Sequence, residues 1–207
     1  MNRVRDLVNG ILASKEAFFE YKDEVILRDL IPDTKPPLYL HEFFKPWPEE
    51  VIRTDIVETF KYHFPEEVQE FYRITNGCFL FGRQIRIYGY PHRTAEYMMV
   101  RQPSWLQMEN NNLPPWRRKE KLLFASYAPE SKIHVFYNTN ASGIELPVIA
   151  VREGEKTILK AWKSFGDWFM SEYDRYMEMY QNQQYTMRDI GNRSIGKYII
   201  FSFNNVL

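Results

Sequence analysis

The chain has 207 residues, of which 44% are hydrophobic and 16% aromatic, enough apolar surface for one sizeable core. Its 27 basic and 27 acidic side chains give a net charge of zero, so there is no basis for a general attraction to nucleic acid or to an anionic membrane. The single cysteine, Cys78, excludes an internal disulfide framework. No apolar run approaches the roughly 18 residues that cross a bilayer. The start of the chain also lacks the uninterrupted apolar segment of a signal peptide. We therefore predict a globular, cytoplasmic protein.

The first part of the chain is predicted to be helical. Residues 4–30 place apolar side chains at spacings that mostly suit one face of an amphipathic helix or helix pair. Three prolines in IPDTKPP, residues 31–37, must end this helix, because proline lacks a backbone donor and makes its predecessor extended. Residues 1–40 are therefore expected to be a helical extension with a proline-rich connector.

Two similar segments, WPEEV at 47–51 and FPEEV at 64–68, mark helix starts. Proline suits the first turn, and the two carboxylates suit the positive end of the helix dipole. These patterns predict helices over 49–63 and 65–75. Asn76-Gly77 follows the second helix, and since both residues tolerate a left-handed conformation, they are predicted to cap it.

Strands are predicted downstream of this corner. Apolar and polar residues alternate over 84–89, and further strands are indicated at 122–127, 132–137, 147–152 and 156–162. Glu153-Gly154 predicts a hairpin between the last two. Ser164 and Asp167 approximate a capping box for a final helix with an aromatic stripe. The fold class is thus α+β, with a largely antiparallel sheet packed with N-terminal and C-terminal helices.

Few patterns in the sequence indicate chemistry. Cys78 could be a nucleophile activated by one of the four histidines. The simpler interpretation is that Cys78 is a small apolar residue at the start of a strand. Those histidines, His41, His63, His92 and His134, show no close metal-ligand spacing. GNRSIGKY at 191–198 departs from a phosphate-binding loop, since Tyr198 stands where a hydroxyl should reach a metal ion. PPWRRKEK at 114–121 has the residues of a nucleic-acid contact, but a solvated loop is the simpler interpretation. We predict no catalytic residue, no metal site and no cofactor.

The segment FPEEVQEFYRITNG at 64–77 is followed by the predicted strands and then by SFGDWF at 164–169. This order resembles the SUKH superfamily, which includes bacterial immunity proteins and fungal cell-wall assembly regulators. The resemblance extends over about residues 45–181, and we take 41–181 as the domain, leaving 182–207 as a tail that could add an edge strand. The resemblance implies a non-catalytic intracellular binding protein, most directly an immunity protein that neutralises a cognate bacterial toxin. The alternative is a regulatory or scaffold module with a non-toxin partner. The residues that carry the resemblance are Pro65, Phe71, Tyr72, Asn76, Gly77, Phe165 and Trp168.

Charge is segregated along the neutral chain. Residues 49–72 contain seven acids and two bases, a net charge of −5, whereas residues 82–121 contain eight bases and three acids, a net charge of +5. Toxins that cleave nucleic acid need a basic groove, which an acidic helical surface could approach and cover. We hypothesise that Glu66, Glu67 and Glu70 contact the partner. The competing explanation is that helix starts attract carboxylates and solvated faces carry charge.

Overall fold

The computed structural model describes residues 3–13, 19–21, 25–31, 38–46, 49–50, 65–89, 106–111, 113, 121–127, 132–138, 147–155 and 157–181. The helices of this described part are α1 (Arg3–Leu12), α3 (Glu66–Ile74), α4 (Leu106–Asn111) and α6 (Phe165–Gln181). Its strands are β1 (Phe19–Tyr21), β2 (Val25–Ile31), β3 (Leu38–Phe44), β4 (Cys78–Leu80), β5 (Ile85–Ile87), β6 (Lys121–Tyr127), β7 (Ile133–Asn138), β8 (Val148–Arg152) and β9 (Ile158–Trp162).

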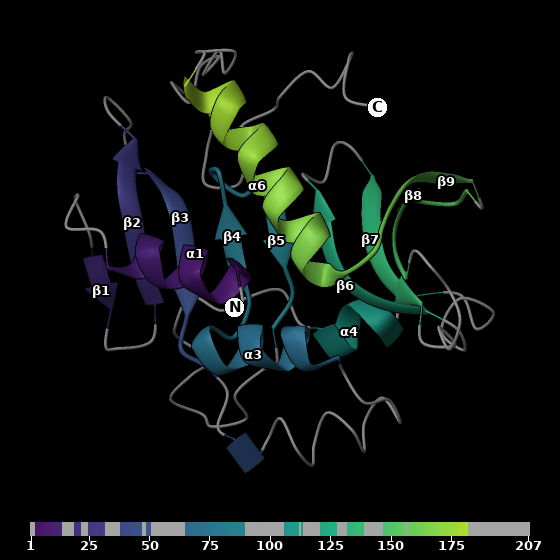
Figure 1. Cartoon of the computed structure of the whole chain (residues 1–207), viewed down its shortest axis with the longest axis horizontal. Helices are drawn as coiled ribbons and strands as arrows, with labels where there is room; N and C mark the ends of the chain where they lie inside the picture. The colour runs from purple at the N-terminus through teal and green to yellow at the C-terminus, as the bar shows by residue number, and fades with distance from the viewer. Residues whose placement is uncertain are drawn as a thin grey trace.

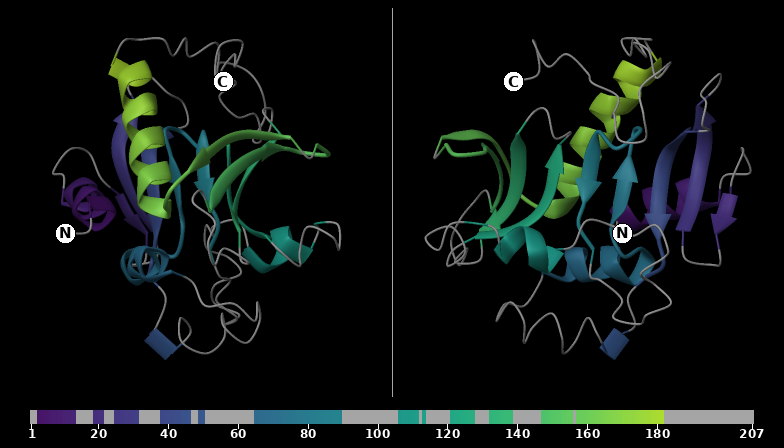
Figure 2. Two further views of the ribbon diagram at one scale, coloured as in Figure 1. Left: turned by 45° about the vertical axis from the view of Figure 1, so that its right-hand side comes forward. Right: turned by 180° about the vertical axis from the view of Figure 1, so that it is seen from behind.

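The described strands form one sheet in which spatial order follows chain order from β1 to β9, and every neighbouring pair is antiparallel. Figure 1 shows α1 and α6 in front of this sheet, with α3 crossing below its central strands. The sheet bends strongly where β8 and β9 lie (Figure 2). The predicted α+β class with an antiparallel sheet is confirmed.

The core lies between the sheet and the helices, and it is largely aromatic. The Phe71 ring of α3 lies 5.3 Å from that of Phe165 and 5.8 Å from that of Phe169, both on α6. Phe124 of β6 completes the contact from the sheet, with its ring centroid 5.6 Å from that of Phe165. All four side chains are buried. Such offset and tilted ring pairs add to the stabilisation that burial of their area provides.

Among the described residues of the N-terminal segment, the helix prediction is right for Arg3–Leu12 alone. Residues 19–21 and 25–31 are strands instead, and β3 crosses the predicted domain boundary between residues 40 and 41. The β-branched side chains of Val25, Ile26 and Ile31 suit a strand. In the register of β2 with β3, these three residues are the partners of Phe44, Phe43 and Leu38. Cross-strand pairing therefore outweighs the helical spacing that the apolar residues also fit.

The corner after α3 has the predicted positive φ, at Gly77 (φ +78°). The prediction that Asn76-Gly77 caps the helix is wrong. Thr75 is the C-cap residue, in an extended conformation (φ −153°), and Gly77 lies two residues further on. A second constraint acts on Gly77: a Cβ atom there would lie 2.6 Å from the Ile87 carbonyl oxygen and 3.0 Å from the Gly89 nitrogen. Glycine is thus required by the close approach of β5 as well as by its φ.

The remaining predicted strands are confirmed as β5 to β9, and Gly154 (φ +79°) lies in the hairpin between β8 and β9. The Ser164 part of the predicted capping box is also present, since its Oγ accepts a hydrogen bond from the Asp167 N–H at 3.0 Å. The predicted helix over 49–63, the GNRSIGKY segment and the tail after 182 lie outside the described residues, apart from Glu49 and Glu50.

Candidate interaction surface

The three carboxylates predicted to contact a partner all lie on the first turns of α3, but their surroundings differ. Pro65 precedes the helix, and its carbonyl accepts hydrogen bonds from the N–H groups of Val68 and Gln69. Glu66 is exposed, whereas Glu67 and Glu70 are half-buried. Glu66 and Glu67 differ because adjacent residues of a helix point about 100° apart around the axis, whereas Glu70, four residues after Glu66, shares its side of the helix. The three side chains therefore do not form one uniform patch.

Glu67 caps another helix. Its two carboxylate oxygens accept hydrogen bonds from the backbone N–H groups of Phe165 at 2.6 Å and Gly166 at 3.0 Å, the first residues of α6. The first N–H groups of a helix have no partner within it, and a negative charge there interacts favourably with the helix dipole. Together, Glu67 and Ser164 provide acceptors for the first backbone N–H groups of α6. Its carboxylate serves to join α3 to α6.

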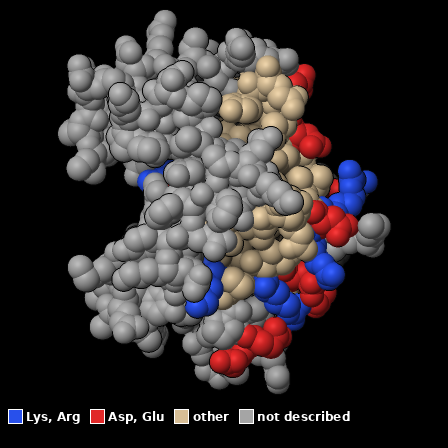
Figure 3. All heavy atoms as spheres, turned by 90° about the vertical axis from the view of Figure 1, so that its left-hand side faces the viewer, with Lys and Arg blue, Asp and Glu red and all other residues tan. Residues whose placement is uncertain are grey.

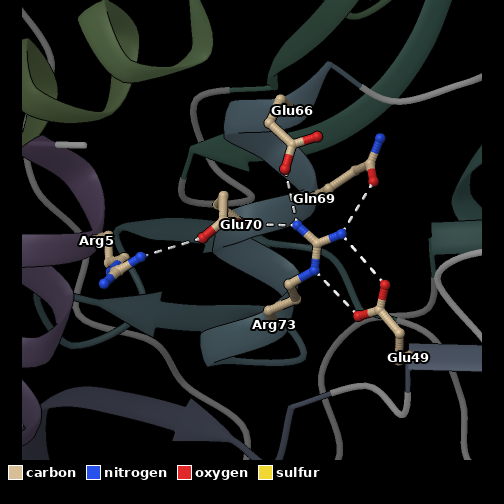
Figure 4. A network of polar contacts seen from close by, with 6 residues as sticks. All are labelled: Arg5, Glu49, Glu66, Gln69, Glu70 and Arg73. Carbon is tan, nitrogen blue, oxygen red and sulfur yellow. Dashed lines mark hydrogen bonds and ion pairs between the residues drawn. The ribbon is translucent and has the colours of Figure 1, made fainter. Parts of the chain in front are cut away.

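Glu66 and Glu70 instead meet at Arg73, one turn further along α3 (Figure 4). The Nη1 atom of Arg73 donates to Glu66 Oε1 at 3.0 Å and to Glu70 Oε1 at 2.7 Å. Its Nε atom donates to Glu49 Oε2 at 3.0 Å, so the same guanidinium reaches a residue far away in the sequence. Arg5 of α1 joins from the other side, with Nη1 3.6 Å from Glu70 Oε2. We call these five residues the Arg73 network.

The Arg73 network changes the charge expected for this surface. Three carboxylates face two guanidinium groups, so the network itself carries a net charge of −1. The acidic segment identified in the sequence ended at Tyr72, one residue before the arginine that neutralises much of it. In Figure 3, blue and red side chains lie next to one another in the described part of the surface. The surface is thus a set of fixed, paired charges with a small acidic excess.

Apart from the half-buried Pro65, the residues that carry the family resemblance are buried. Phe71, Tyr72, Phe165 and Trp168 are all buried in the core. The Tyr72 hydroxyl donates to the Tyr88 carbonyl at 2.9 Å and so fixes α3 to the sheet beyond β5. The backbone N–H of Asn76 donates to the Phe44 carbonyl at 3.0 Å, which joins the corner to β3. These residues set the position of α3 and α6 without reaching the surface.

Thr75 has a structural role that the sequence did not indicate. Its buried Oγ1 accepts from the Phe44 N–H at 3.2 Å and lies 2.9 Å from the Phe44 carbonyl and 2.7 Å from that of Gly77. Threonine after a helix is a common sequence feature, so only the packing of β3 against this corner reveals the contact.

A second charged group lies between α6 and β9. The carboxylate of Glu172 is buried, and its Oε1 accepts from Lys160 Nζ at 3.0 Å. Its Oε2 accepts from Arg175 Nε at 3.0 Å and from Nη2 of the same residue. We call these three residues the Glu172 network. No sequence motif indicated it, because Lys160 belongs to a strand and the other two residues belong to a helix.

Two buried titratable residues, Cys78 and His41, lie in the core. Burial raises the pKa of the Cys78 thiol well above its usual value, which disfavours the reactive thiolate. Burial lowers the pKa of His41 to about 3, so the imidazole is neutral at pH 7. The His41 ring lies 5.0 Å from that of Phe81 and 5.8 Å from that of Tyr173. Both residues therefore have the surroundings of core side chains.

Within the described residues, no three His, Cys, Asp or Glu side chains are grouped so that they could hold a metal ion. The helices in the same part of the chain are too short or too polar to span a bilayer.

Comparison with known protein families gives a match over residues 48–171, more than half of the chain, to the SMI1 / KNR4 family (SUKH-1). The comparisons with curated proteins and with solved structures gave no match. The matched segment includes α3, the corner at Gly77, strands β4 to β9 and the first part of α6. It also includes all seven residues that carry the resemblance in the sequence. The chain therefore belongs to the SMI1 / KNR4 family (SUKH-1) of the SUKH superfamily.

Proposed function

We propose that this chain is a non-catalytic binding protein and, more specifically, an immunity protein that neutralises a cognate bacterial toxin by direct contact. Membership of the SUKH-1 family supports a binding role, since the superfamily includes immunity and regulatory proteins. The structural observation that carries the proposal is the Arg73 network, which orients the exposed carboxylates of Glu66 on α3 and of Glu49 beside it.

Fixed carboxylates suit the recognition of a basic groove. A long acidic side chain normally loses rotamer freedom when it binds, and this loss weakens association. Glu66 and Glu49 are already oriented by Arg73 although their side chains are 74% and 53% exposed. Lysine and arginine side chains of a partner can therefore bind them at a reduced entropic cost. The acidic excess of the network would also speed the encounter with a basic surface.

The proposed contact surface consists of Glu49, Glu66 and Glu70. Glu67 is left out because both of its oxygens bind the start of α6. The sequence alone groups Glu67 with Glu66 and Glu70, but the structure gives it a different role. A substitution of Glu67 therefore tests the fold, whereas a substitution of Glu66 tests the surface.

The alternative function is that of a regulatory or scaffold module whose partner is not a toxin. The same surface would serve it, so the genes next to this one and the partner itself distinguish the two functions. For both functions we propose that the chain acts inside the cell, because its single cysteine is a buried thiol and suits a reducing compartment.

The test begins with a search of the neighbouring genes for an encoded toxin domain, which the immunity function requires. Binding of the full chain to the purified domain is measured by calorimetry, and toxin activity is measured at increasing amounts of the chain. We expect one chain to bind one toxin domain, and inhibition to be complete at that ratio. If the folded chain does not bind the domain, the immunity function is wrong. If far smaller amounts abolish toxin activity, the non-catalytic mechanism is wrong.

A further inference from the structure

Among the described strands, β9 forms one edge of the sheet. Within the described residues it pairs only with β8, and Figure 2 shows the two strands on the outer side of the molecule. Along an edge strand, alternate residues turn their N–H and C=O groups away from the neighbouring strand. These groups can pair with an extended segment of another protein. The edge of β9 therefore has the backbone geometry for the addition of a strand.

The two faces of β9 differ in chemistry because of a bulge. Ala150 and Val151 are adjacent in β8 and so point to opposite faces of the sheet. Their partners in β9 are Lys160 and Ile158, with Leu159 as the extra residue. Since cross-strand partners share a face, Ile158 and Lys160 point to opposite faces, although regular alternation would place them together. The edge thus presents the apolar Ile158 on one face and the cationic Lys160 on the other.

Ile158 supplies the apolar side. Its side chain is 51% exposed, which makes it the large hydrophobic residue that stands out on the surface of the described chain. A partner side chain placed beside it would remove apolar area from water.

The Glu172 network supplies the cationic side. One carboxylate faces two cations, which leaves one positive charge in excess. Lys160 has three N–H donors and Arg175 has five, so Glu172 does not use them all. Both side chains reach solvent, at 41% and 26% exposure. Lys160 also lies over the Trp162 ring, with Nζ 5.0 Å from its centroid, and is thereby held toward α6. In this position its ammonium group lies on the α6 side of β9.

From these observations we propose that the β9 edge binds an extended segment of a partner protein in which apolar and acidic residues alternate. The backbone of the segment pairs with β9, its apolar side chains pack beside Ile158, and its carboxylates bind Lys160 and Arg175. Glu172 acts as the positioning residue for these two cations. This site differs from the Arg73 network in place and in charge, and it does not depend on the partner of that network being a toxin.

The test is a titration of the isotope-labelled full chain with a capped synthetic peptide of alternating valine and glutamate, followed by NMR. We expect saturable shifts of the amide signals of β9 and of α6 near Arg175. A peptide in which lysine replaces glutamate should not produce these shifts. Methylation of alternate backbone nitrogens should weaken binding about tenfold, because it removes the donors that pair with the edge.

Two matched variants test the contribution of the cations. Lys160→Met should weaken binding of the glutamate peptide about fivefold, while Lys163→Met, which removes an exposed lysine just after β9, should change it less than about twofold. Thermal melting verifies that both variants fold. If Lys160→Met does not fold, the peptide comparisons decide. The proposal is wrong if the lysine peptide produces the same shifts, if the shifts lie elsewhere or are absent, or if the two variants weaken binding equally.

Discussion

The two charged networks of this protein have opposite compositions and opposite surroundings. In the Arg73 network, a central arginine is held by the carboxylates of Glu49, Glu66 and Glu70 at the surface. In the Glu172 network, a buried carboxylate is held by two cations between α6 and β9. The central residue has hydrogen-bonded partners of opposite charge in both. The exposure of the carboxylates differs between the networks: the Glu66 side chain is 74% exposed, whereas that of Glu172 is only 2% exposed.

This difference indicates what each network does. Water screens exposed ion pairs, so they contribute little to stability and their carboxylates stay accessible to a partner. A buried charge has lost its hydration, so its partners are needed to keep it in the folded chain. We therefore propose that the Arg73 network serves in binding. For the Glu172 network, the burial of the carboxylate supports a structural role, and we propose a binding role only for its two partly exposed cations.

The largest effect is expected at Glu172. Glu172→Ala leaves Lys160 and Arg175 without their common carboxylate and should lower the free energy of unfolding by about 3 kcal/mol. Glu178→Ala removes an exposed carboxylate from the same helix and should change it by less than about 0.5 kcal/mol. Urea denaturation at neutral pH measures both values. Equal effects would show that burial does not distinguish the two sites.

A buried base that belongs to neither network extends this contrast to pH. The folded pKa of His41, about 3, lies below its unfolded value of 6.5. The unfolded chain therefore binds the proton more readily, and stability falls as the pH drops from 6.5 toward 3. Between pH 7 and pH 5, His41 should lower the free energy of unfolding of the native protein by about 2 kcal/mol. The His41→Phe variant has no such group and should not show this loss. Urea midpoints at the two pH values provide the measurement, and an unchanged pH dependence in the variant would contradict the assignment.

A smaller effect is expected at Glu67, which lies next to Glu66 but not in its network. Glu67→Gln keeps the size of the side chain while it removes the charge at the start of α6, and should cost about 1 kcal/mol of stability. Glu66→Gln is the matched control and should cost less than about 0.5 kcal/mol. Thermal melting of both variants tests this order. A control as destabilising as Glu67→Gln would mean that the surface, and not the cap, limits stability.

The smallest effect on stability is expected at Arg73. Its contacts with Glu49, Glu66 and Glu70 are largely exposed, so Arg73→Met should lower stability by less than about 1 kcal/mol at low salt. The difference from the native protein should shrink further at high salt, because mobile ions screen exposed pairs. Denaturation at two salt concentrations measures it. A large loss that salt does not alter would place Arg73 in the structural class with Glu172.

Local patterns in the sequence predicted the central part of the fold. Helix α3, the positive φ of Gly77 and the final four strands follow from apolar spacing and turn chemistry, which act over a few residues. Strands β2 and β3 were missed because Val25 and Ile26 also fit a helical face, and only their pairing with Phe44 and Phe43 decides between the two structures. This pairing joins segments on either side of the proline-rich stretch, so no local window contains it.

The candidate surface was predicted only in outline. The sequence indicated carboxylates at the start of α3, but it could not separate Glu67 from Glu66, because the backbone groups that Glu67 caps lie almost a hundred residues away. The charge count also missed Arg73, because charge along a chain is a poor measure of charge in space. The Glu172 network depends on the packing of β9 against α6 and has no local sequence pattern.

The most direct test of the account is the rate at which the toxin domain associates with two charge-reversed variants of equal net charge. One variant carries Glu66→Lys and Glu70→Lys on α3, and the other carries Asp174→Lys and Glu178→Lys, two exposed positions of α6. If the Arg73 network is the contact surface, the α3 variant should associate about tenfold more slowly at low salt, less so at moderate salt, and the α6 variant should stay close to the native rate. Equal rates for the two variants, or an α3 variant with native rate and affinity at both salts, would contradict it.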